Sequence, residues 1–251
     1  MNIHSVVGFT PSHAAPNLSP VMPTVLITGA SRGLGLEFAR QYAGDGWRVL
    51  ACCREPEAAD ELNRLAAASE GRVSVHRLDV DDGASVAACR EELTGAEFDV
   101  LINNAGIIGD RGAGLGDMDY AAFEACLRTN VVGPMRVTEA FADRFAAAGE
   151  KKLVTISSRM GSIAETAPNA IIYRTSKAAV NMLMRCLSME LAGRGVTSVV
   201  VHPGWVRTDM GGRGAALTPT ESVAALRKVI AGLSKRDNGC FFNYDGQPIP
   251  W

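Results

Sequence analysis

The amino-acid sequence predicts an α/β fold: a single domain with a parallel, doubly wound sheet and helices on both of its faces. Short apolar runs alternate with helical patterns from residue 24 onward, and one of these runs, residues 98–103, is almost continuously apolar. Alternation at this rhythm is typical of a parallel sheet, and a nearly continuous apolar run indicates a strand with both faces covered. A chain of 251 residues is long enough for one large core of this type.

The elements of the first half follow in regular order. Residues 24–28 form an apolar run that predicts a buried strand, and the helical pattern of residues 33–46 ends in glycine. The remaining elements of this half are strands at residues 47–53, 72–78 and 98–103 and helices at 57–68 and 82–93.

The second half continues the alternation with longer helices. The predicted elements are a long helix from about Asp119 to Ala148, a strand at 152–157, a helix from Ala170 to Ala192, a strand at 197–202, a helix that begins at Pro219, and a last strand at 240–243. Ligands of such sheets bind beyond the carboxyl ends of the strands. Functional residues are therefore expected immediately after strands.

Composition and charge argue against several classes of protein. The net charge of −2 provides no basic field for nucleic acid, no run of Lys and Arg suggests a membrane surface, and no apolar stretch is long enough to span a bilayer. The six cysteines and four histidines show no metal-ligand spacing, so no metal site is expected. Buried, reduced thiols fit a cytoplasmic protein.

The first 22 residues differ from the rest of the chain. They are rich in proline and contain neither a basic segment nor a sustained apolar one, so a signal peptide is not expected. We expect residues 1–22 to be a mobile tail, or an upstream extension with Met22 as the true start, followed by one domain at residues 23–251.

A glycine-rich turn follows the first predicted strand. The segment TGASRGLG, from Thr28 to Gly35, places glycines where side chains would obstruct a ligand or the packing of helix on sheet. The helix that follows offers free N–H groups and its positive end to a pyrophosphate. The spacing G-x-x-x-G-x-G differs from the G-x-G-x-x-G pattern, but its place between strand and helix favours a dinucleotide site over a generic turn.

The end of the second predicted strand indicates which dinucleotide is bound. Proteins that bind NAD carry an acid there for the ribose 2′-hydroxyl, whereas this chain has Cys53 followed by Arg54. Arg32, in the glycine turn, is a second guanidinium at the same corner, and two guanidiniums suit a 2′-phosphate. Glu55 is the competing signal, and two solvated surface arginines are the alternative. We expect NADP(H) to be preferred over NAD(H).

Tyr173 and Lys177 lie one helical turn apart in the segment YRTSK. Side chains at this spacing share one face of a helix, and most such pairs are solvated surface residues. The pair gains significance from five further motifs in the expected order: TGASRGLG, NNAG at residues 103–106, TNVVG at 129–133, ISSRMGS at 156–162, and HPGWVRTDM at 202–210.

With these motifs the sequence resembles the short-chain dehydrogenase/reductase family from Thr24 to Trp251. The closing segment FFNYDGQPIPW and the segment YRTSKAA further resemble a branch that contains the insect carbonyl reductase sniffer and bacterial C-factor-like reductases. The resemblance implies a Rossmann-type fold and an oxidoreductase that transfers a hydride between a nicotinamide and a ketone or an aldehyde, or oxidises the corresponding alcohol.

The resemblance also implies a set of catalytic residues. Tyr173 would exchange the proton with the substrate oxygen, and the nearby ammonium of Lys177 would lower the tyrosine pKa from its usual value of about 10. Lys177 would also bind the nicotinamide ribose. Ser158 would hydrogen-bond the substrate oxygen, with Ser157 and Ser162 as competing candidates. Asn130 would hold a water in a proton relay to Lys177.

Further site residues follow from the same resemblance. Asp79, with Val80 beside it, would meet the adenine amino group, and Thr208 the carboxamide or pyrophosphate. Cofactor contacts are implied for Gly29, Ser31, Arg32, Gly33, Leu34, Gly35, Arg54, Asp79, Val80, Asn104, Ala105, Gly106, Tyr173, Lys177, Pro203, Gly204, Val206 and Thr208.

The substrate is expected to be a small carbonyl or alcohol of apolar character. Met160, Ile163, Trp205 and Met210 could form an apolar wall, and the glycine-rich loops at 107–117 and 208–218 would be a mobile lid or plain flexible loops. No obvious clamp for a phosphate or carboxylate group of a substrate appears, although Arg159 and Arg207 keep that possibility open.

The alternative function is that of a non-catalytic dinucleotide-binding regulator with the same fold. An epimerase or dehydratase with a further substrate domain would need a longer chain.

The helix that contains Tyr173 is apolar almost all round. One face must pack on the sheet, so the remaining apolar residues suggest a contact with a second protein surface. We expect a homodimer formed through the two long helices, or a homotetramer.

Overall fold

Seven parallel strands form a single sheet in the order β3-β2-β1-β4-β5-β6-β7. The computed structural model describes residues 22–112, 114–146 and 149–251, so the expected tail at residues 1–22 lies outside the described residues except for Met22. The strands are β1 (Thr24–Thr28), β2 (Arg48–Cys53), β3 (Val73–Arg77), β4 (Val100–Asn103), β5 (Lys152–Ile156), β6 (Thr197–His202) and β7 (Phe241–Asn243).

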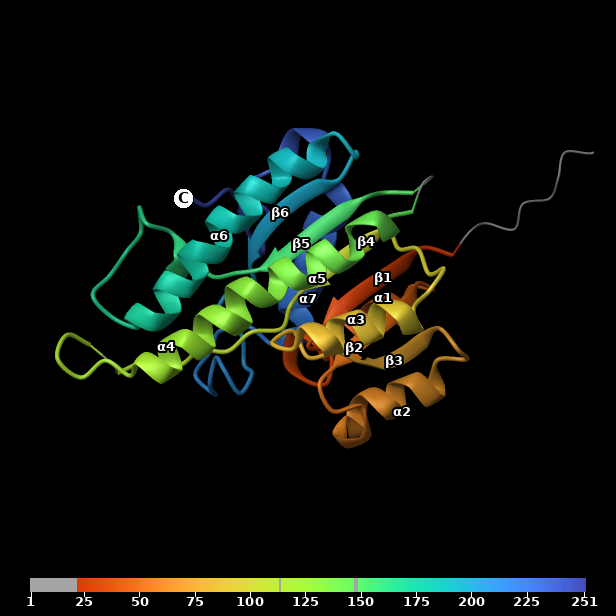
Figure 1. The fold of residues 1–251 in the computed structure, drawn as a ribbon, viewed down its shortest axis with the longest axis horizontal. Coiled ribbons are helices and arrows are strands. Elements are labelled where there is room, and N and C mark those ends of the chain that lie inside the picture. The colour runs from red at the N-terminus through yellow and green to blue at the C-terminus, as the bar shows by residue number, and fades with distance from the viewer. Residues whose placement is uncertain (1–21, 113, 147–148) are drawn as a thin grey trace, which may run out of the picture.

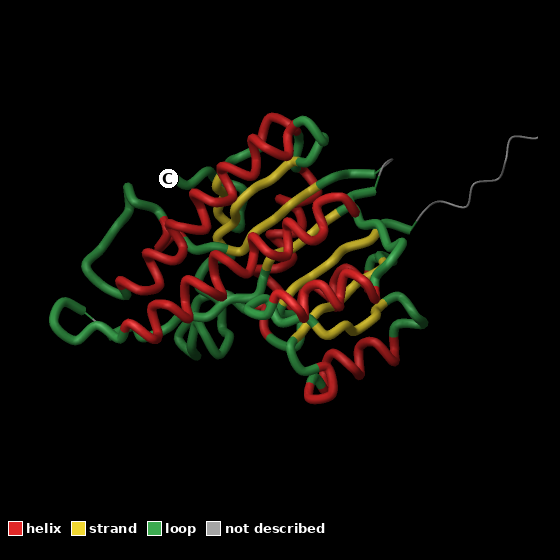
Figure 2. Tube along the Cα trace, in the orientation of Figure 1, coloured by secondary structure: helices red, strands yellow, loops and turns green. Residues whose placement is uncertain are grey.

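The helices cover both faces of this sheet (Figure 1). They are α1 (Gly33–Gly44), α2 (Asp60–Ala68), α3 (Gly83–Glu92), α4 (Tyr120–Leu127), α5 (Gly133–Phe141), α6 (Ile171–Ala192) and α7 (Pro219–Gly232). Coloured by secondary structure, the chain shows strands in a layer between helices (Figure 2). The predicted doubly wound α/β fold is confirmed.

Alternate residues of the buried strands belong to different halves of the core. Val25 and Ile27 of β1 belong to the cluster with α1, α2 and α7, whereas Leu26 belongs to the cluster with α3, α5 and α6. Successive strand side chains point to opposite faces, and both faces of β1 are covered. This is why its sequence is apolar without interruption.

The predicted long helix from Asp119 to Ala148 is wrong in two respects. It is interrupted between α4 and α5 by a π-helical turn, Arg128–Val132, and the helical segment ends near Phe141, followed by a short 3₁₀ turn. Phe145 instead forms a parallel bridge with Phe98, and the amide of Ala146 donates to the Phe98 carbonyl at 2.9 Å. Pairing of Phe145 with Phe98 beside the sheet therefore replaces the end of the helix that the sequence pattern predicts.

The sheet reverses its winding between β1 and β4. β1 pairs with β2 on one side and with β4 on the other, so the connections leave in opposite directions from this point. Crevices at such a reversal bind ligands at the carboxyl ends of the strands. The glycine turn after β1 and the segment after β4 therefore begin at the same place. Among the described helices, none has the length and apolar character needed to span a bilayer.

Candidate active site

Two cavities open at the carboxyl edge of the sheet and share several residues. The larger, of about 660 Å³, is lined by the turn after β1 and by the ends of β2, β3 and β4, and we call it the glycine-turn cavity. The other, of about 550 Å³, is lined by Met160, Met210 and Trp205, and we call it the methionine cavity. Tyr173 lines both, so its side chain lies where they meet.

Close packing explains two glycines of the turn. Gly29 has a φ of +66°, and a Cβ there would lie 2.9 Å from the Cα of Ala105. A Cβ on Gly35 would lie 2.2 Å from the carbonyl oxygen of Gly29 and 2.6 Å from Nδ2 of Asn104. The bare backbone is thus required for the turn to approach the segment after β4.

The turn is tied to that segment by hydrogen bonds. The backbone amide of Asn104 donates to Oγ1 of Thr28 at 3.0 Å, and its side-chain amide donates to the Thr28 carbonyl at 2.9 Å. The expected cofactor residues that line the glycine-turn cavity are Gly29, Ser31, Arg32, Gly33, Leu34, Arg54, Asp79, Val80, Asn104, Ala105, Gly106, Tyr173, Lys177, Pro203 and Thr208. Gly35 lies behind them, and Gly204 and Val206 line the methionine cavity instead.

Both arginines expected to bind a 2′-phosphate line the glycine-turn cavity. Arg32 and Arg54 lie there together with Cys53, which is buried at the end of β2. Arg32 forms a salt bridge of 3.4 Å with Asp209, in the loop after β6. Both side chains are mostly exposed, so this pair contributes little to stability and leaves the Arg32 guanidinium available to an anionic ligand.

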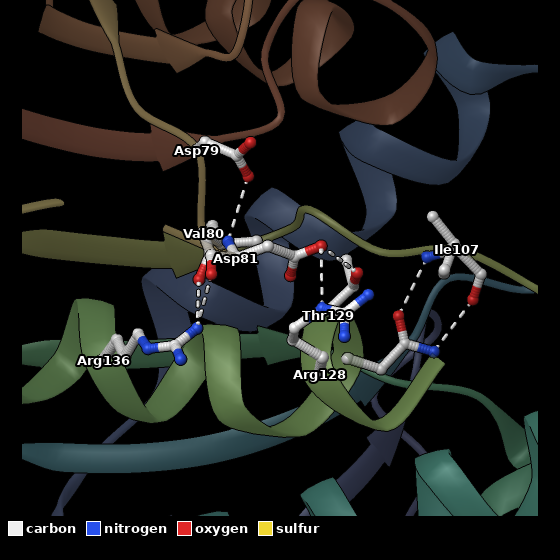
Figure 3. A network of polar contacts seen from close by, with 8 residues as sticks. Asp79, Val80, Asp81, Ile107, Arg128, Thr129 and Arg136 are labelled. Carbon is white, nitrogen blue, oxygen red and sulfur yellow. Dashed lines mark hydrogen bonds and ion pairs between the residues drawn. The ribbon is translucent and has the colours of Figure 1, made fainter. Parts of the chain in front are cut away.

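A polar network links the loop after β3 to the π-helical turn (Figure 3). Asp81 accepts a hydrogen bond of 2.7 Å from the hydroxyl of Thr129, and Arg128 lies 4.0 Å from the same carboxylate oxygen. Arg136 of α5 donates to the carbonyls of Val80 and Asp81 at 3.2 and 3.0 Å. The segment expected to contact adenine is therefore joined directly to the π-helical turn and to α5.

Asn130 lies in the π-helical turn and is almost completely buried. Its side chain accepts from the amide of Ile107 and donates to the carbonyl of Ile107, both at 2.8 Å (Figure 3). It also donates to the hydroxyl of Ser176 at 2.9 Å. Asn130 thus holds the chain just after Gly106, and it lines neither cavity.

Tyr173 and Lys177 face the junction of the cavities from the first turns of α6. Both are buried, and the Lys177 ammonium lies 5.6 Å from the centroid of the Tyr173 ring. The same ammonium donates to the carbonyl of Ile156, at the end of β5, at 3.0 Å. This bond fixes the lysine between α6 and the sheet.

Burial shifts the pKa values of both residues. Removal from water raises the pKa of Tyr173 to about 12, although a hydrogen bond with Ser158 acts in the opposite direction. Burial likewise lowers the pKa of Lys177 to about 8. The lowered tyrosine pKa expected from the sequence is therefore not found in the protein alone, because desolvation outweighs the effect of neighbouring charges. The phenol is protonated at neutral pH.

Three serines near the end of β5 have different surroundings. Ser158 caps a short 3₁₀ turn, accepts from the amide of Met160 at 3.1 Å, and acts to lower the pKa of Tyr173. Ser157 donates instead to Asn181 at 2.7 Å. Ser162 accepts from the amide of Glu165 and lines neither cavity. Of the three, Ser158 is the one placed beside the phenol.

The methionine cavity contains three of the four residues expected to contact substrate. Met160, Trp205 and Met210 line it, and Sδ of Met210 lies 4.0 Å from the Tyr173 hydroxyl. Ile163 does not: its side chain is 73% exposed and lines neither cavity. The chain turns outward after the 3₁₀ turn at Arg159–Gly161, which carries Ile163 away from the sheet edge.

The sequence analysis missed several polar residues of the methionine cavity. Arg111, Glu165 and Arg174 all line it. His202 lines it too; burial, with the charge of Arg159 as a second cause, lowers the His202 pKa to about 4, so this ring is neutral at pH 7. Arg174 and His202 lie within the segments YRTSK and HPGWVRTDM, but these motifs assign no role to them, and Arg111 and Glu165 come from loops that no motif connects. Only the position of His202, just before Pro203-Gly204, could have drawn attention to it.

The described residues contain no group of histidine, cysteine and acidic side chains that could hold a metal ion. All six cysteines are free thiols; four of them are buried. The chemistry available at the junction is therefore that of a protonated phenol, a hydroxyl and a buried amine beside two cavities.

A family model described as short chain dehydrogenase matches residues 23–216. Among characterised proteins, the C-signal protein of Myxococcus xanthus is 44% identical over 154 residues, which cover 61% of this chain and 92% of that protein.

Solved structures resemble the chain over almost its whole length. The carbonyl reductase Sniffer of D. melanogaster superposes with a TM-score of 0.85 at 30% identity, covering 92% of this chain and 100% of that one. An NADPH-bound carbonyl reductase from chicken fatty liver superposes with a TM-score of 0.84 at 34% identity, covering 92% and 99%.

Proposed function

Because this chain is an oxidoreductase that belongs to the short-chain dehydrogenase family, we propose that it reduces the carbonyl group of a ketone or an aldehyde with NADPH, or oxidises the corresponding alcohol. The expected likeness to the branch with sniffer and C-factor-like reductases is confirmed by the similarity to Sniffer and to C-signal. The substrate and the catalytic roles below are our proposal.

The glycine-turn cavity suits a nicotinamide dinucleotide. Two of its glycines stand where a side chain would collide with backbone atoms, so the turn presents bare N–H groups to a pyrophosphate. Arg32 and Arg54 line the same cavity, where a guanidinium fork could bind a 2′-phosphate. NADP(H) is therefore the proposed cofactor, as it is in the NADPH-bound chicken enzyme.

Reduction requires a hydride at the carbonyl carbon and a proton at the carbonyl oxygen. Bound NADPH would supply the hydride and leave as NADP⁺. Tyr173 would supply the proton from its hydroxyl, which is protonated at neutral pH because burial raises its pKa to about 12. The carbonyl double bond is thereby replaced by one C–H and one O–H bond.

Ser158 and Lys177 support this transfer from two sides. Ser158, which lines the methionine cavity with Tyr173, would donate to the substrate oxygen as negative charge develops on it. Lys177, charged below its pKa of about 8, would stabilise the phenolate left behind. Asn130 would fix the chain beside Gly106 through its two bonds to Ile107, and the water that it was expected to hold remains a prediction.

The single observation that carries this proposal is the place of Tyr173, buried at the junction of the two cavities with Ser158 and Lys177 beside it. Tyr173→Phe removes only the hydroxyl. We expect kcat/KM for NADPH-dependent reduction of simple ketones and aldehydes to fall by about 10²–10⁴-fold, the usual contribution of a positioned proton donor. NADPH oxidation followed at 340 nm measures this.

NADPH binding to the same variant, measured by fluorescence, serves as the control and should be unchanged. NADH in place of NADPH should support slower reduction. If the wild type binds NADPH but reduces no carbonyl compound in a broad panel, the chain is better understood as a dinucleotide-binding regulator. Full activity of Tyr173→Phe would remove the tyrosine from the mechanism.

A further inference from the structure

The methionine cavity has an excess of positive charge around a mostly apolar interior. Its charged residues are Arg111, Arg159, Glu165 and Arg174, and His202, the remaining titratable side chain of the lining besides Tyr173, is neutral at pH 7. Glu165 forms a salt bridge with Arg159 at 3.6 Å. Two guanidiniums, those of Arg111 and Arg174, remain to be explained.

Neither of these two arginines has a carboxylate within salt-bridge distance in the part of the chain that the structure describes. Residues 1–21, 113 and 147–148 contain no aspartate or glutamate, so they cannot supply one either. Most lysines and arginines of the described residues also lack a carboxylate partner, so the lack of one is not unusual by itself. Arg111 and Arg174 are distinguished instead by their place in the lining of one mostly apolar cavity.

Carbonyl groups hold both arginines in place while leaving donors free. Nε of Arg174 donates to the carbonyl and to the side chain of Asn169, each at 3.0 Å, and Nη1 donates to the Met160 carbonyl at 3.4 Å. Arg111 donates to the Met210 carbonyl through Nη2. Among the described residues, Nη2 of Arg174 and Nη1 of Arg111 have no hydrogen-bond partner.

The two arginines lie on the substrate side of Tyr173. Both line the methionine cavity, and neither lines the glycine-turn cavity, where the dinucleotide would bind. They are therefore not the cofactor's phosphate ligands. The charge of Arg111 acts to lower the pKa of Tyr173, but burial of the phenol raises this pKa by more.

We propose that the methionine cavity binds carbonyl substrates that carry an anionic oxyacid group, a carboxylate or a phosphate, which Arg174 and Arg111 bind while an apolar segment lies against Met160 and Met210. This inference rests on the proposed reductase function and adds the substrate class. A guanidinium fork matches the two oxygens of a carboxylate or phosphate. Because the lining of the cavity is mostly apolar, an apolar segment of the substrate would be buried against it.

The test compares matched charged and neutral ketones. 5-Oxohexanoate and its methyl ester share the carbonyl and the spacer, and a phosphate monoester of a hydroxyketone distinguishes the two anions. We expect kcat/KM with NADPH to be about tenfold higher for the acid than for the ester. Arg174→Met and Arg111→Met should each reduce this acid-to-ester ratio several-fold, mainly through KM.

Two kinds of control make the outcome decisive. Arg236→Met removes an arginine that lines neither cavity and should leave the acid-to-ester ratio unchanged. Arg111 lies in the loop after β4 and Arg174 in the first turn of α6, so agreement between the two variants rules out a folding defect in one of them. Equal kcat/KM for acid and ester in the wild type would overturn the inference while leaving the reductase function intact.

A binding measurement separates this inference from the proposed function. Calorimetric titration with hexanoate and with hexanamide needs no turnover, and hexanoate should bind more tightly to the wild type and lose that advantage in both methionine variants. If no ketone is reduced but this selectivity is seen, the reductase function fails and the anion site stands. Equal binding of the two probes would count against the anion site directly.

Discussion

Lys177 is buried between α6 and the end of β5, where its ammonium donates to the carbonyl of Ile156 at 3.0 Å. Burial lowers its pKa from 10.5 to about 8. A base whose pKa is lower in the folded state than in the unfolded state costs stability at any pH below the folded value. Burial of this ammonium therefore costs folding free energy, which is consistent with the catalytic role that we propose for it.

Lys177→Met should accordingly stabilise the protein alone while removing its activity. A change of this size in pKa corresponds to about 3 kcal/mol, from which the lost hydrogen bond to Ile156 subtracts about 1 kcal/mol. We expect the free energy of unfolding at pH 7, measured with urea, to rise by about 2 kcal/mol.

The pH dependence provides the check on this assignment. Lys177 has a pKa near 10.5 in the unfolded chain and about 8 in the folded protein. As the pH rises between these two values, the free energy of unfolding of the wild type should increase relative to that of the variant. Above pH 10.5 the burial cost is gone, so the wild type should be the more stable of the two by about 1 kcal/mol, the contribution of the hydrogen bond to Ile156. A variant less stable than the wild type at pH 7 would contradict the pKa argument.

For individual residues, the sequence predicted which ones belong to the candidate site better than it predicted what they contact. Tyr173, Lys177 and Ser158 could be placed from motifs because each lies just after a strand or early in a helix that the parallel fold brings to one edge. The roles that we propose for Arg111 and Arg174 could not be predicted, because Arg111 lies in a loop whose path no local pattern determines and the cavity that Arg174 lines is built by segments distant in sequence. Ile163 was misplaced for the same reason.

The π-helical turn is the element that departs most from the local pattern. Residues 119–148 read as one continuous helix, yet the turn at Arg128–Val132 has wider hydrogen bonding. Its partners are all distant in sequence: Thr129 bonds Asp81, and Asn130 bonds Ile107. A tertiary network therefore decides the conformation here, and the sequence within the helix carries no sign of it. Such turns are frequent at functional sites.

Thr129→Val tests whether this network positions Asn130. The change removes a hydrogen bond of 2.7 Å to Asp81 and keeps the size of the side chain. We expect a loss of about 1 kcal/mol in stability and a fall of about tenfold in kcat, with a smaller rise in KM for NADPH, because Arg136 still holds the backbone of Asp81.

Thr129→Ser keeps the hydroxyl and should restore kcat close to the wild-type value. Steady-state kinetics with NADPH and denaturation with urea measure the two effects separately. If the valine variant loses stability but retains kcat, Thr129 has only a structural role.

The strands were the most predictable elements, for a physical reason. β1 and β4 are buried on both faces, so residues 25–27 of β1 and 100–102 of β4 are apolar without interruption. The predicted strand at 98–103 is nevertheless shortened to Val100–Asn103, and Phe98 forms only a single bridge to Phe145. Burial predicts where a strand runs, but its ends depend on which partner strand is present.

At the scale of the whole molecule, an exposed apolar surface remains on the outer side of α6. Met182 and Met189 lie seven residues apart, about two helical turns, and are 65% and 63% exposed. Ile171 and Val132 add to the exposed apolar residues of this helical layer. We therefore propose that two copies of the chain associate through this surface, as the apolar character of the helix suggests.

Sedimentation equilibrium at micromolar concentration should give at least twice the mass of one chain, 26.5 kDa. Met182→Asp places a charge in the expected interface and should shift the mass toward that of the monomer. Leu115→Asp alters a more exposed residue, in the loop before α4, and should not. A monomeric wild type under these conditions would exclude a stable homodimer.

The π-helical turn also limits how this region can change in evolution. Each residue of an α-helix advances the side chains by about 100° around the axis. Deleting one residue from the π-helical turn would avoid that rotation, because the wider turn would become a regular one, but it would move Thr129 and Asn130 away from their partners Asp81 and Ile107. Insertions and deletions should therefore be tolerated in the loop before α4 and selected against within the bulge.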